Sequence, residues 1–432
     1  MNSRILHPLT ALTWLAIAAC GSSSKGDPAQ GGSSGSIQPG NTSSDDAGES
    51  PGSRGDDGSE PDQGPAGDDA TDDAGGPGDG DGEPGTPGDA APRDAATHDG
   101  GSHDASTPPA GDGGPTGGCS GSTSGPLVGW ASVSGMGVST TTGGAGGPTV
   151  TVSTLADLNT NAAGTTARVI EIHGTIAGNV TVGSNKTLVG TCGAEIHGHV
   201  QMTGSANVIV RNLTVVGYDC TDNPSDCSGG ADGVSVERSA HHLWFDHDDI
   251  SDGSDGNLDI THASDFITIS WTRFHYSGRR TDPAGAAGGH QFSNLIGHSD
   301  SNASEDTGHL RVTFHHDWWA DNVVERMPRV RFGQVHLFDN LYTATGNDYC
   351  VGVGVSADIR DENDVFVGVK NPIDSQDYSN GASAIASSGD LFQMTTGTTQ
   401  DIGGAAFTPP YTYALDPASD VASMVKNGAG PP

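Results

Sequence analysis

Residues 243–250 read LWFDHDDI, and four other stretches of the chain follow nearly the same plan. They are VIVRNLTV from Val208, ITISWTRF from Ile267, VTFHHDWW from Val312 and VHLFDNLY from Val335. Each has two apolar positions of the inward-pointing type, then a small polar residue or histidine, then an apolar or aromatic end. The starts are separated by 35, 24, 45 and 23 residues. A base period near 23 with longer excursions is typical of stacked coils that bury their strands against neighbouring coils.

This repeat predicts an all-β fold, a right-handed single-stranded parallel β-helix. A β-propeller is the competing repeat fold, but propellers favour periods of about 40 residues or more and tighter hairpin signals. One corner of the stack is expected to carry the polar residues Asn212, Asp246, Ser270, His315 or His316, and Asn340. A short C-terminal helix is predicted from Pro417, because PASDVASMVKNGAG places Val421, Met424 and Val425 on one face and ends at Asn427-Gly428.

The chain before this repeat divides into two parts. Residues 1–20 have one cation, a short apolar run and the string Ile17-Ala18-Ala19-Cys20, which is typical of a signal peptide with a lipobox. Cys20 is therefore the predicted lipidation site. The residue after it is Gly21 rather than an aspartate, which favours the outer membrane as the destination of the lipoprotein. Residues 21–120 hold 20 acids and three bases among Gly, Ser, Pro and Ala. We expect this segment to be a disordered acidic linker, and residues 121–432 to form the β-helix domain.

Charge and cysteine content restrict the function classes. The formal net charge is -36, and the part after the linker keeps 34 acids and 14 bases, which argues against a nucleic-acid partner. Export through an N-terminal signal predicts a secreted or extracellular monomer that contacts a membrane only through its lipid. In that oxidising compartment Cys220 and Cys227, which bracket the loop CTDNPSDC, are the best candidates for a disulfide.

Three aspartates and one arginine stand at similar distances before the repeated strands. Asp232 lies 11 residues before Leu243, Asp255 and Asp259 lie 12 and 8 before Ile267, and Arg326 lies 9 before Val335. Because these positions fall in one sector of successive coils, we expect the side chains to converge. Converged carboxylates without thiols or imidazoles favour Ca²⁺. The alternative is a set of unrelated surface aspartates, which are common in turns.

The domain resembles a pectate lyase of the family-one polysaccharide lyases. The resemblance runs from about Gly129 to Gly430 and rests on strings in family order. They are GWASVSGMGVSTTTGGAGG, GSNKTLVG, NVIVRNLTV, ADGVSV, LWFDHDDISDGSDGNLDI, FITISWTRF, NLIGHSDS, LRVTFHHDWW, ERMPRVRFGQVHLFDNLY and PPYTYALDPASDV. It implies a parallel β-helix, dependence on Ca²⁺ and β-elimination of polygalacturonate (pectate).

The resemblance also assigns roles to individual residues. Asp232, Asp255 and Asp259 match the calcium-ligand positions, Arg326 matches the catalytic base and Arg331 the substrate-binding arginine. Two positions depart from the family pattern: Gly230 stands where a further acid is common, and Phe292 stands where a substrate-binding lysine is usual. Arg279, Arg280 or His290 are candidates to replace that lysine.

Two other functions remain open from the sequence. The departures at Gly230 and Phe292 fit a non-catalytic β-helix that binds uronate polymers or serves as a surface adhesin. A pectin lyase acting on methyl-esterified polymer is the other alternative, but the resemblance implies that such enzymes lack the aspartate trio. Histidine-rich strings such as HHLWFDH could indicate a zinc site. Stacking at a corner and hydrogen bonds in the core are the favoured interpretation, because neighbouring side chains of a strand point to opposite faces.

Overall fold

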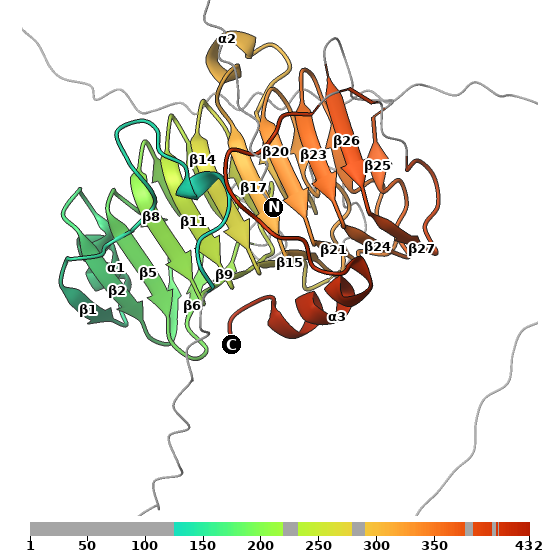
Figure 1. Ribbon diagram of the computed structural model, residues 1–432. Coiled ribbons are helices and arrows are strands. Elements are labelled where there is room, and N and C mark those ends of the chain that lie inside the picture. Colours follow the sequence, from blue (N-terminus) through green and yellow to red (C-terminus); the bar gives the residue numbers. More distant parts are fainter. Residues whose placement is uncertain (1–124, 219–231, 279–289, 376–382, 400–402, 405) are drawn as a thin grey trace, which may run out of the picture. The chain divides into compact units, whose positions relative to one another are not determined.

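The computed structural model describes residues 125–218, 232–278, 290–375, 383–399, 403–404 and 406–432. Their strands form three parallel sheets of ten, eight and nine strands, and from β2 onward successive strands along the chain fall in different sheets. Figure 1 shows the resulting stack of coils, with each coil contributing one strand to each sheet in turn. The predicted right-handed parallel β-helix with a short C-terminal helix is confirmed.

The elements are numbered in chain order. The ten-stranded sheet consists of β1 (Thr149–Val152), β2 (Arg168–Ile172), β5 (Lys186–Gly190), β8 (Ala206–Arg211), β11 (His241–Asp246), β14 (Asp265–Ser270), β17 (Arg311–His315), β20 (Gln334–Phe338), β23 (Asp358–Glu362) and β26 (Ala384–Ser388). The eight-stranded sheet consists of β4 (Val180–Thr181), β7 (Val200–Thr203), β10 (Val234–Glu237), β13 (Leu258–Ile260), β16 (Leu295–Ile296), β19 (Arg329–Val330), β22 (Val351–Val353) and β25 (Ile373–Asp374). The nine-stranded sheet consists of β3 (Thr175–Ala177), β6 (Glu195–His197), β9 (Thr214–Val216), β12 (Asp249–Ser251), β15 (Arg273–His275), β18 (Trp318–Trp319), β21 (Leu341–Tyr342), β24 (Val365–Val367) and β27 (Leu391–Gln393). The helices are η1 (Trp130–Ser132), α1 (Leu155–Ala162), α2 (Ala303–Asp306) and α3 (Ala418–Gly428).

The repeat read from the sequence is the register of the ten-stranded sheet. The first residues of the five strings, Val208, Leu243, Ile267, Val312 and Val335, pair with one another in that order across β8, β11, β14, β17 and β20. All five are buried in the main hydrophobic core. Burial of one such aliphatic side chain contributes about 1.5–3 kcal/mol, so this column stabilises the register that aligns every other position of the coils.

The corner prediction is only partly right. Asp246, Ser270 and His315 do pair across adjacent strands, but Asn212 and His316 lie one position later and Asn340 two positions later. The hydrogen-bonded ladder at this corner consists instead of Thr272, Asp317, Asn340 and Asp364, in which each backbone N–H donates to the side-chain oxygen of the next coil at 2.7–2.9 Å. The repeat in the sequence does not predict this ladder, because several polar residues follow one another at the bend. Only the backbone geometry decides which of their side chains points inward.

The aspartates of this ladder have raised pKa values. Burial raises the pKa of Asp317 well above its ordinary value, because the backbone N–H of Thr272 offsets only part of the cost of a buried charge. Burial likewise raises the pKa of Asp364 to about 6. The interior of the coil stack therefore holds carboxyl groups that favour their neutral form.

Segments from both ends of the domain cover the stack. Backbone N–H groups of Trp130 and Ala131 donate to the hydroxyls of Thr313 and Thr268 on the ten-stranded sheet, both at 3.1 Å. Helix α3 packs on β21 and β24, and Val421 and Val425 of its predicted apolar face are buried against Leu341 and Val365, whereas Met424 of that face is only partly buried. Figure 1 shows α3 along one flank of the stack.

Several sequence predictions lie outside the described residues. They concern the signal peptide and Cys20, the linker 21–120 and the Cys220–Cys227 disulfide. Among the described cysteines, Cys192 is disulfide-bonded and Cys350 is a buried free thiol. The described part of the chain contains no helix that is both long and apolar enough to cross a membrane.

The acidic ladder predicts that folding stability declines with rising pH. Unfolded aspartates ionise near pH 4, whereas folded Asp317 and Asp364 hold their protons to higher pH. Their contribution is therefore complete below about pH 4 and is lost as the pH rises through the folded pKa values. In chelator, the Tm should fall between pH 5 and pH 8. Asp317→Asn should raise the Tm at pH 8 by about 2–4 °C, because an amide accepts the same N–H without becoming charged.

Scanning calorimetry at both pH values measures this difference. The matched control is Asp348→Asn, since Asp348 is exposed and pairs only with exposed Lys370 at 3.5 Å. Parallel pH profiles for wild type and Asp317→Asn would contradict the assignment of the ladder as the cause.

Candidate functional site

The three predicted aspartates occupy two neighbouring coils, at or just before strands β10 and β13 of the eight-stranded sheet. β10 pairs with β13 so that Val234 lies beside Leu258 and Ser235 beside Asp259. The same register places Asp232 beside Gly256, and the N–H of Gly233 donates to the carbonyl of Gly256 at 2.9 Å. Leu258 and Ile260 point into the core. Asp259 therefore points to the outer face of the sheet, where Asp232 and Asp255 approach it.

The carboxylates of Asp232 and Asp259 face a common space beside Gly256. A Cβ atom on Gly256 would stand 2.7 Å from Asp259 Oδ1 and 3.3 Å from Asp232 Oδ1, so only glycine leaves this space open. Ser235 Oγ donates to Asp232 Oδ2 at 2.6 Å, and Leu295 N donates to Asp259 Oδ1 at 2.9 Å. Asp232 Oδ1 is buried and has no hydrogen-bond partner among the described residues.

Electrostatics confirm that the three carboxylates interact. Burial and the charges of Asp259 and Asp255 raise the pKa of Asp232 well above its ordinary value. Burial and the charge of Asp255 raise the pKa of Asp259 to about 7. For Asp255 burial also opposes ionisation, but the hydrogen bond from His290 and the charge of Arg326 outweigh it and lower the pKa. Without a cation, the charges of these three carboxylates repel one another, which makes the group a candidate functional site.

Arg326 lies near these acids, two coils further along the stack than Asp255 and Asp259. Short bridges join Gly256 to Phe292 and Phe292 to Glu325, which places Arg326 one position after this column. Its guanidinium carbon stands 4.1 Å from the centre of the Phe292 ring, and its Nε is buried without a hydrogen-bond partner in the described structure. Burial lowers the pKa of Arg326, but Tyr349, Asp259 and Asp255 outweigh it and raise that pKa above the ordinary value.

Arg331 follows strand β19, which separates it from Arg326 in the chain. Its guanidinium contacts the loop that contains Gly297 and Asp300. Arg331 comes directly after Val330, the last residue of β19, whose side chain is in the core. Its Nε donates to Asp300 Oδ1 at 2.5 Å and its Nη1 donates to the carbonyl of Gly297 at 2.9 Å. Burial and the charge of Arg329 lower the pKa of Arg331, although Asp300 opposes this effect.

The structure places Phe292, one of the two positions that depart from the expected pattern, and His290, one of the candidates to replace the missing lysine. His290 Nδ1 lies 2.7 Å from Asp255 Oδ1, so His290 orients an acid of the trio. Phe292 stacks between His290, with ring centres 4.4 Å apart, and Arg326. The sequence missed the contacts of Ser235 and Asp300, because nothing in their local pattern distinguishes them from other surface residues. Gly230, Arg279 and Arg280 lie outside the described residues.

The donor set fits Ca²⁺. All candidate atoms of Asp232, Asp255 and Asp259 are carboxylate oxygens, which Ca²⁺ prefers over nitrogen or sulfur. The unsatisfied Oδ1 of Asp232 and the open space at Gly256 give an ion both a ligand and room. A divalent cation there would also cancel the charge repulsion that raises the pKa values of Asp232 and Asp259.

Comparison with known proteins places the chain in a family. Residues 110–431 match the sequence profile of the family described as "Pectate lyase". The chain belongs to the pectate lyase family. It is 38% identical over 226 residues to "Probable pectate lyase B" of Aspergillus flavus, which covers 50% of this chain and 61% of that protein. It is 32% identical over 367 residues to "Pectate lyase E" of Dickeya chrysanthemi, covering 70% and 89% of the two chains.

Solved pectate lyases share the fold. The structure titled "Pectate lyase bound to hexasaccharide" superposes with a TM-score of 0.56 at 24% identity, covering 70% of this chain and 96% of that one. The chain spans about three fifths of the length of the first curated relatives that it matches. Family membership agrees with the family resemblance read from the sequence motifs and with the β-helix.

The stacking of Arg326 on Phe292 predicts a stabilising role for a residue that departs from the family pattern. Phe292→Ala removes a buried ring that contacts both Arg326 and His290, so the free energy of unfolding should fall by roughly 3–5 kcal/mol. Urea unfolding measures the change. The control is Phe392→Ala, because the Phe392 ring is exposed and its loss should cost less than about 1.5 kcal/mol. Equal losses in the two variants would contradict the packing role.

Proposed function

We propose that this protein is a pectate lyase that cleaves α-1,4-linked polygalacturonate by Ca²⁺-assisted β-elimination, releasing 4,5-unsaturated oligogalacturonides. One observation carries the proposal: three carboxylates with an open, unsatisfied ligand position lie beside the buried guanidinium of Arg326. Similarity to named pectate lyases, one of which is described as bound to a hexasaccharide, supports the choice of a uronate polymer as substrate.

The reaction requires removal of the C5 proton of a galacturonate unit. The electron pair of the C5–H bond forms the C4–C5 double bond, the C4–O bond breaks, and the departing glycosidic oxygen takes up a proton. Negative charge develops on the carboxylate next to C5 as the proton leaves. Asp232, Asp255 and Asp259 would hold Ca²⁺, which supplies positive charge to that carboxylate and makes the C5 proton more acidic.

Arg326 is the proposed base. Its pKa is raised in the metal-free protein, and two of the causes are the charges of Asp259 and Asp255. Neutralisation of these acids removes that support, whereas burial continues to favour the neutral guanidine. The proposed role therefore depends on a cation among the acids, and the rate should increase as the solution becomes more alkaline. Phe292 holds the guanidinium in place from one side.

Arg331 is proposed to bind a substrate carboxylate. A guanidinium fork binds a carboxylate through paired hydrogen bonds, and Asp300 together with the Gly297 carbonyl fixes the orientation of this fork. These cations, with Ca²⁺, would make the site locally positive in a chain whose net charge is -36. Polyanionic substrate can then approach an acidic protein.

The proposed setting is extracellular. The signal and lipobox of residues 1–20 support export and lipidation at Cys20, with the acidic segment 21–120 as a tether between the outer membrane and a monomeric enzyme. The two alternatives from the sequence, a non-catalytic uronate-binding protein and a pectin lyase, remain outcomes of the activity test.

The activity test follows ultraviolet absorbance of the unsaturated uronate product. Wild type should form product from polygalacturonate with Ca²⁺, and chelator should stop it. Arg326→Ala should lower kcat by about 10²–10⁴-fold, because a positioned base contributes that much. Arg238→Ala is the control, since Arg238 is 66% exposed and pairs with Glu237 rather than with the site. Absence of product at every Ca²⁺ concentration and pH would favour the binding protein, and product insensitive to chelator would favour the pectin lyase.

The Ca²⁺ affinity should depend on pH. Ligand carboxylates must be ionised to bind, and Asp259 has a pKa of about 7 in the metal-free protein. Between pH 8 and pH 6 the affinity for Ca²⁺ should therefore fall by about tenfold, with protons released on binding. Isothermal titration calorimetry in two buffers of different ionisation enthalpy measures both quantities. Asp259→Asn should abolish binding and Asp348→Asn should not; an affinity that is constant over this pH range would be inconsistent with the site.

A further inference from the structure

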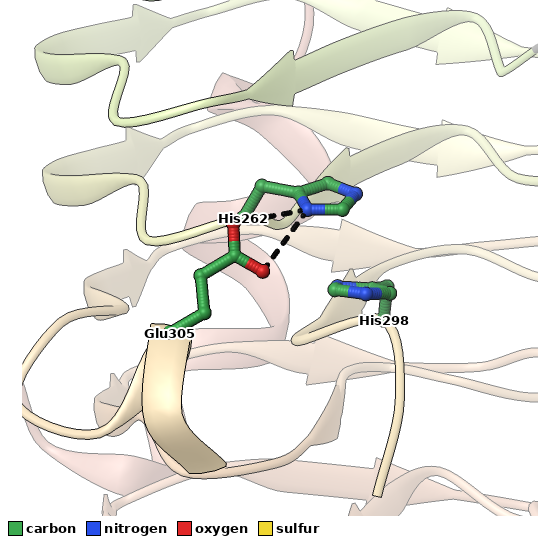
Figure 2. Close-up of side chains that lie close together, drawn as sticks. All are labelled: His262, His298 and Glu305. Carbon is green, nitrogen blue, oxygen red and sulfur yellow. Dashed lines mark hydrogen bonds and ion pairs between the residues drawn. The ribbon is translucent and has the colours of Figure 1, made fainter. Parts of the chain in front are cut away.

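A second group of metal-ligand side chains lies outside the aspartate trio, at the ends of β13 and β16. His262 follows β13, His298 follows β16, and Glu305 lies on α2, the four-residue helix between β16 and β17. One nitrogen from each histidine and one oxygen of Glu305 lie within 4.8 Å of one another. Figure 2 shows the Glu305 carboxylate against the His262 ring, with the His298 ring beside them.

We propose that His262, His298 and Glu305 bind a divalent transition-metal ion of the zinc class, and that this ion fixes the loop segment 298–306 whose Asp300 holds Arg331. Two imidazoles and one carboxylate form a donor set that Zn²⁺ prefers, whereas Ca²⁺ prefers oxygen alone. The two metal sites of this protein would therefore select different ions. This inference goes beyond the proposed function, and metal binding can be measured without activity.

The distances between these side chains are compatible with metal ligation. His262 Nδ1 lies 3.2 and 3.3 Å from the two oxygens of Glu305. Zn²⁺ bonds of 2.0–2.1 Å at tetrahedral angles give a spacing of about 3.3 Å between ligand atoms. The His262 and His298 rings are stacked with centres 3.8 Å apart. The three side chains are 31%, 27% and 40% exposed, so small rotations can close the remaining separation.

The side-chain amide of Asn302 lies between two of the proposed ligands, His298 and Glu305. Asn302 Nδ2 lies 2.5 Å from His298 Nε2 and donates to Glu305 Oε2 at 2.9 Å. Two acceptors of one loop thus converge on one partially positive group. A cation placed among the three ligands would satisfy the same acceptors more strongly and would displace the amide.

Asp306 provides an independent indication of a ligand. Its side chain is fully buried, and its Oδ1 accepts from the N–H of Ala263, the residue after His262, at 2.8 Å. Its Oδ2 has no hydrogen-bond partner in the described part of the chain and lies 3.9 Å from His298 Nδ1. A carboxylate behind a histidine orients the ring and increases its basicity toward a metal on the opposite nitrogen. The proposal assigns Asp306 this positioning role for His298, which requires the 3.9 Å separation to shorten when the metal binds.

The position of the cluster connects it to Arg331. His298 and Glu305 belong to the same loop as Gly297 and Asp300, the two groups that hold the Arg331 guanidinium. Asp300 is 60% exposed, and the loop that carries it is attached to the preceding coil through the contact of Asp306 with Ala263 and of Glu305 with His262. A metal that joins the loop to His262 on the preceding coil strengthens that attachment.

Metal binding by the untagged full chain tests the proposal directly. After treatment with chelator and return to excess Ca²⁺, wild type should bind one Zn²⁺ per chain, and Co²⁺ should give visible absorption of a low-coordinate site. His262→Ala, His298→Ala and Glu305→Gln should each weaken Zn²⁺ binding by at least about tenfold. The matched control is His173→Ala, which removes an exposed histidine outside the cluster.

Two more variants distinguish this site from zinc bound elsewhere on the protein. Asp416→Asn disrupts the other group with metal-ligand spacing, His316, Asp339 and Asp416, and should leave the Zn²⁺ affinity unchanged. Asp306→Asn should weaken Zn²⁺ binding and change the Co²⁺ spectrum without unfolding the protein. No Zn²⁺ binding by wild type, or equal binding by wild type and all cluster variants, would overturn the site.

The connection to Arg331 has a separate test that rests on the proposed function. Zn²⁺ should lower the KM for polygalacturonate about two- to tenfold in wild type, with kcat nearly constant, and should have no such effect in Asp300→Asn. A KM that does not respond to Zn²⁺ in wild type would overturn the connection. Failure of the proposed function would show differently, as absence of product while Zn²⁺ still binds.

Discussion

The backbone register between successive coils is the constraint on which the rest of this structure depends. Parallel pairing carries Val208, Leu243, Ile267, Val312 and Val335 along one buried column. Any slip by one residue would turn those side chains outward, so burial of the column enforces the register. The same alignment brings Asp232 beside Gly256 and places Arg326 near acids that precede it by 67 residues or more. Hydrophobic burial on one sheet thus fixes polar geometry on another.

Buried acids serve two purposes in this fold, and the space around them distinguishes them. Asp317 and Asp364 at the corner each accept a backbone N–H from the preceding coil, so each has a structural partner. Asp317 Oδ2 and Asp232 Oδ1 are both buried without a hydrogen-bond partner in the described structure, but Asp232 Oδ1 also faces, together with Asp259, the space that Gly256 leaves open. Burial raises the pKa of both kinds of group. The convergence of two carboxylates on that open space, rather than an unsatisfied oxygen or the pKa shift, indicates where a cation belongs.

The sequence predicted the column of apolar residues to the residue, because burial selects residue types strongly and repeats them in every coil. It also brought Asp232, Asp255, Asp259 and Arg326 into one sector by counting back from those strands. It failed where consecutive polar residues compete for one inward position, as at Asn340 and Asp317 in the corner. It gave no sign that Phe292 supports Arg326 or that Asp300 holds Arg331. Such contacts join loops of different coils, whose lengths vary without a repeat.

The central claim is that carboxylates from adjacent coils hold Ca²⁺ where a substrate uronate and Arg326 can meet. The most direct measurement is a crystal structure of Arg326→Ala with Ca²⁺ and an oligogalacturonate. We expect an ion bound about 2.3–2.6 Å from oxygens of Asp232, Asp255 and Asp259, in contact with a substrate carboxylate whose C5 faces position 326. A substrate bound on another face, or a Ca²⁺ ion that avoids these three residues, would contradict it.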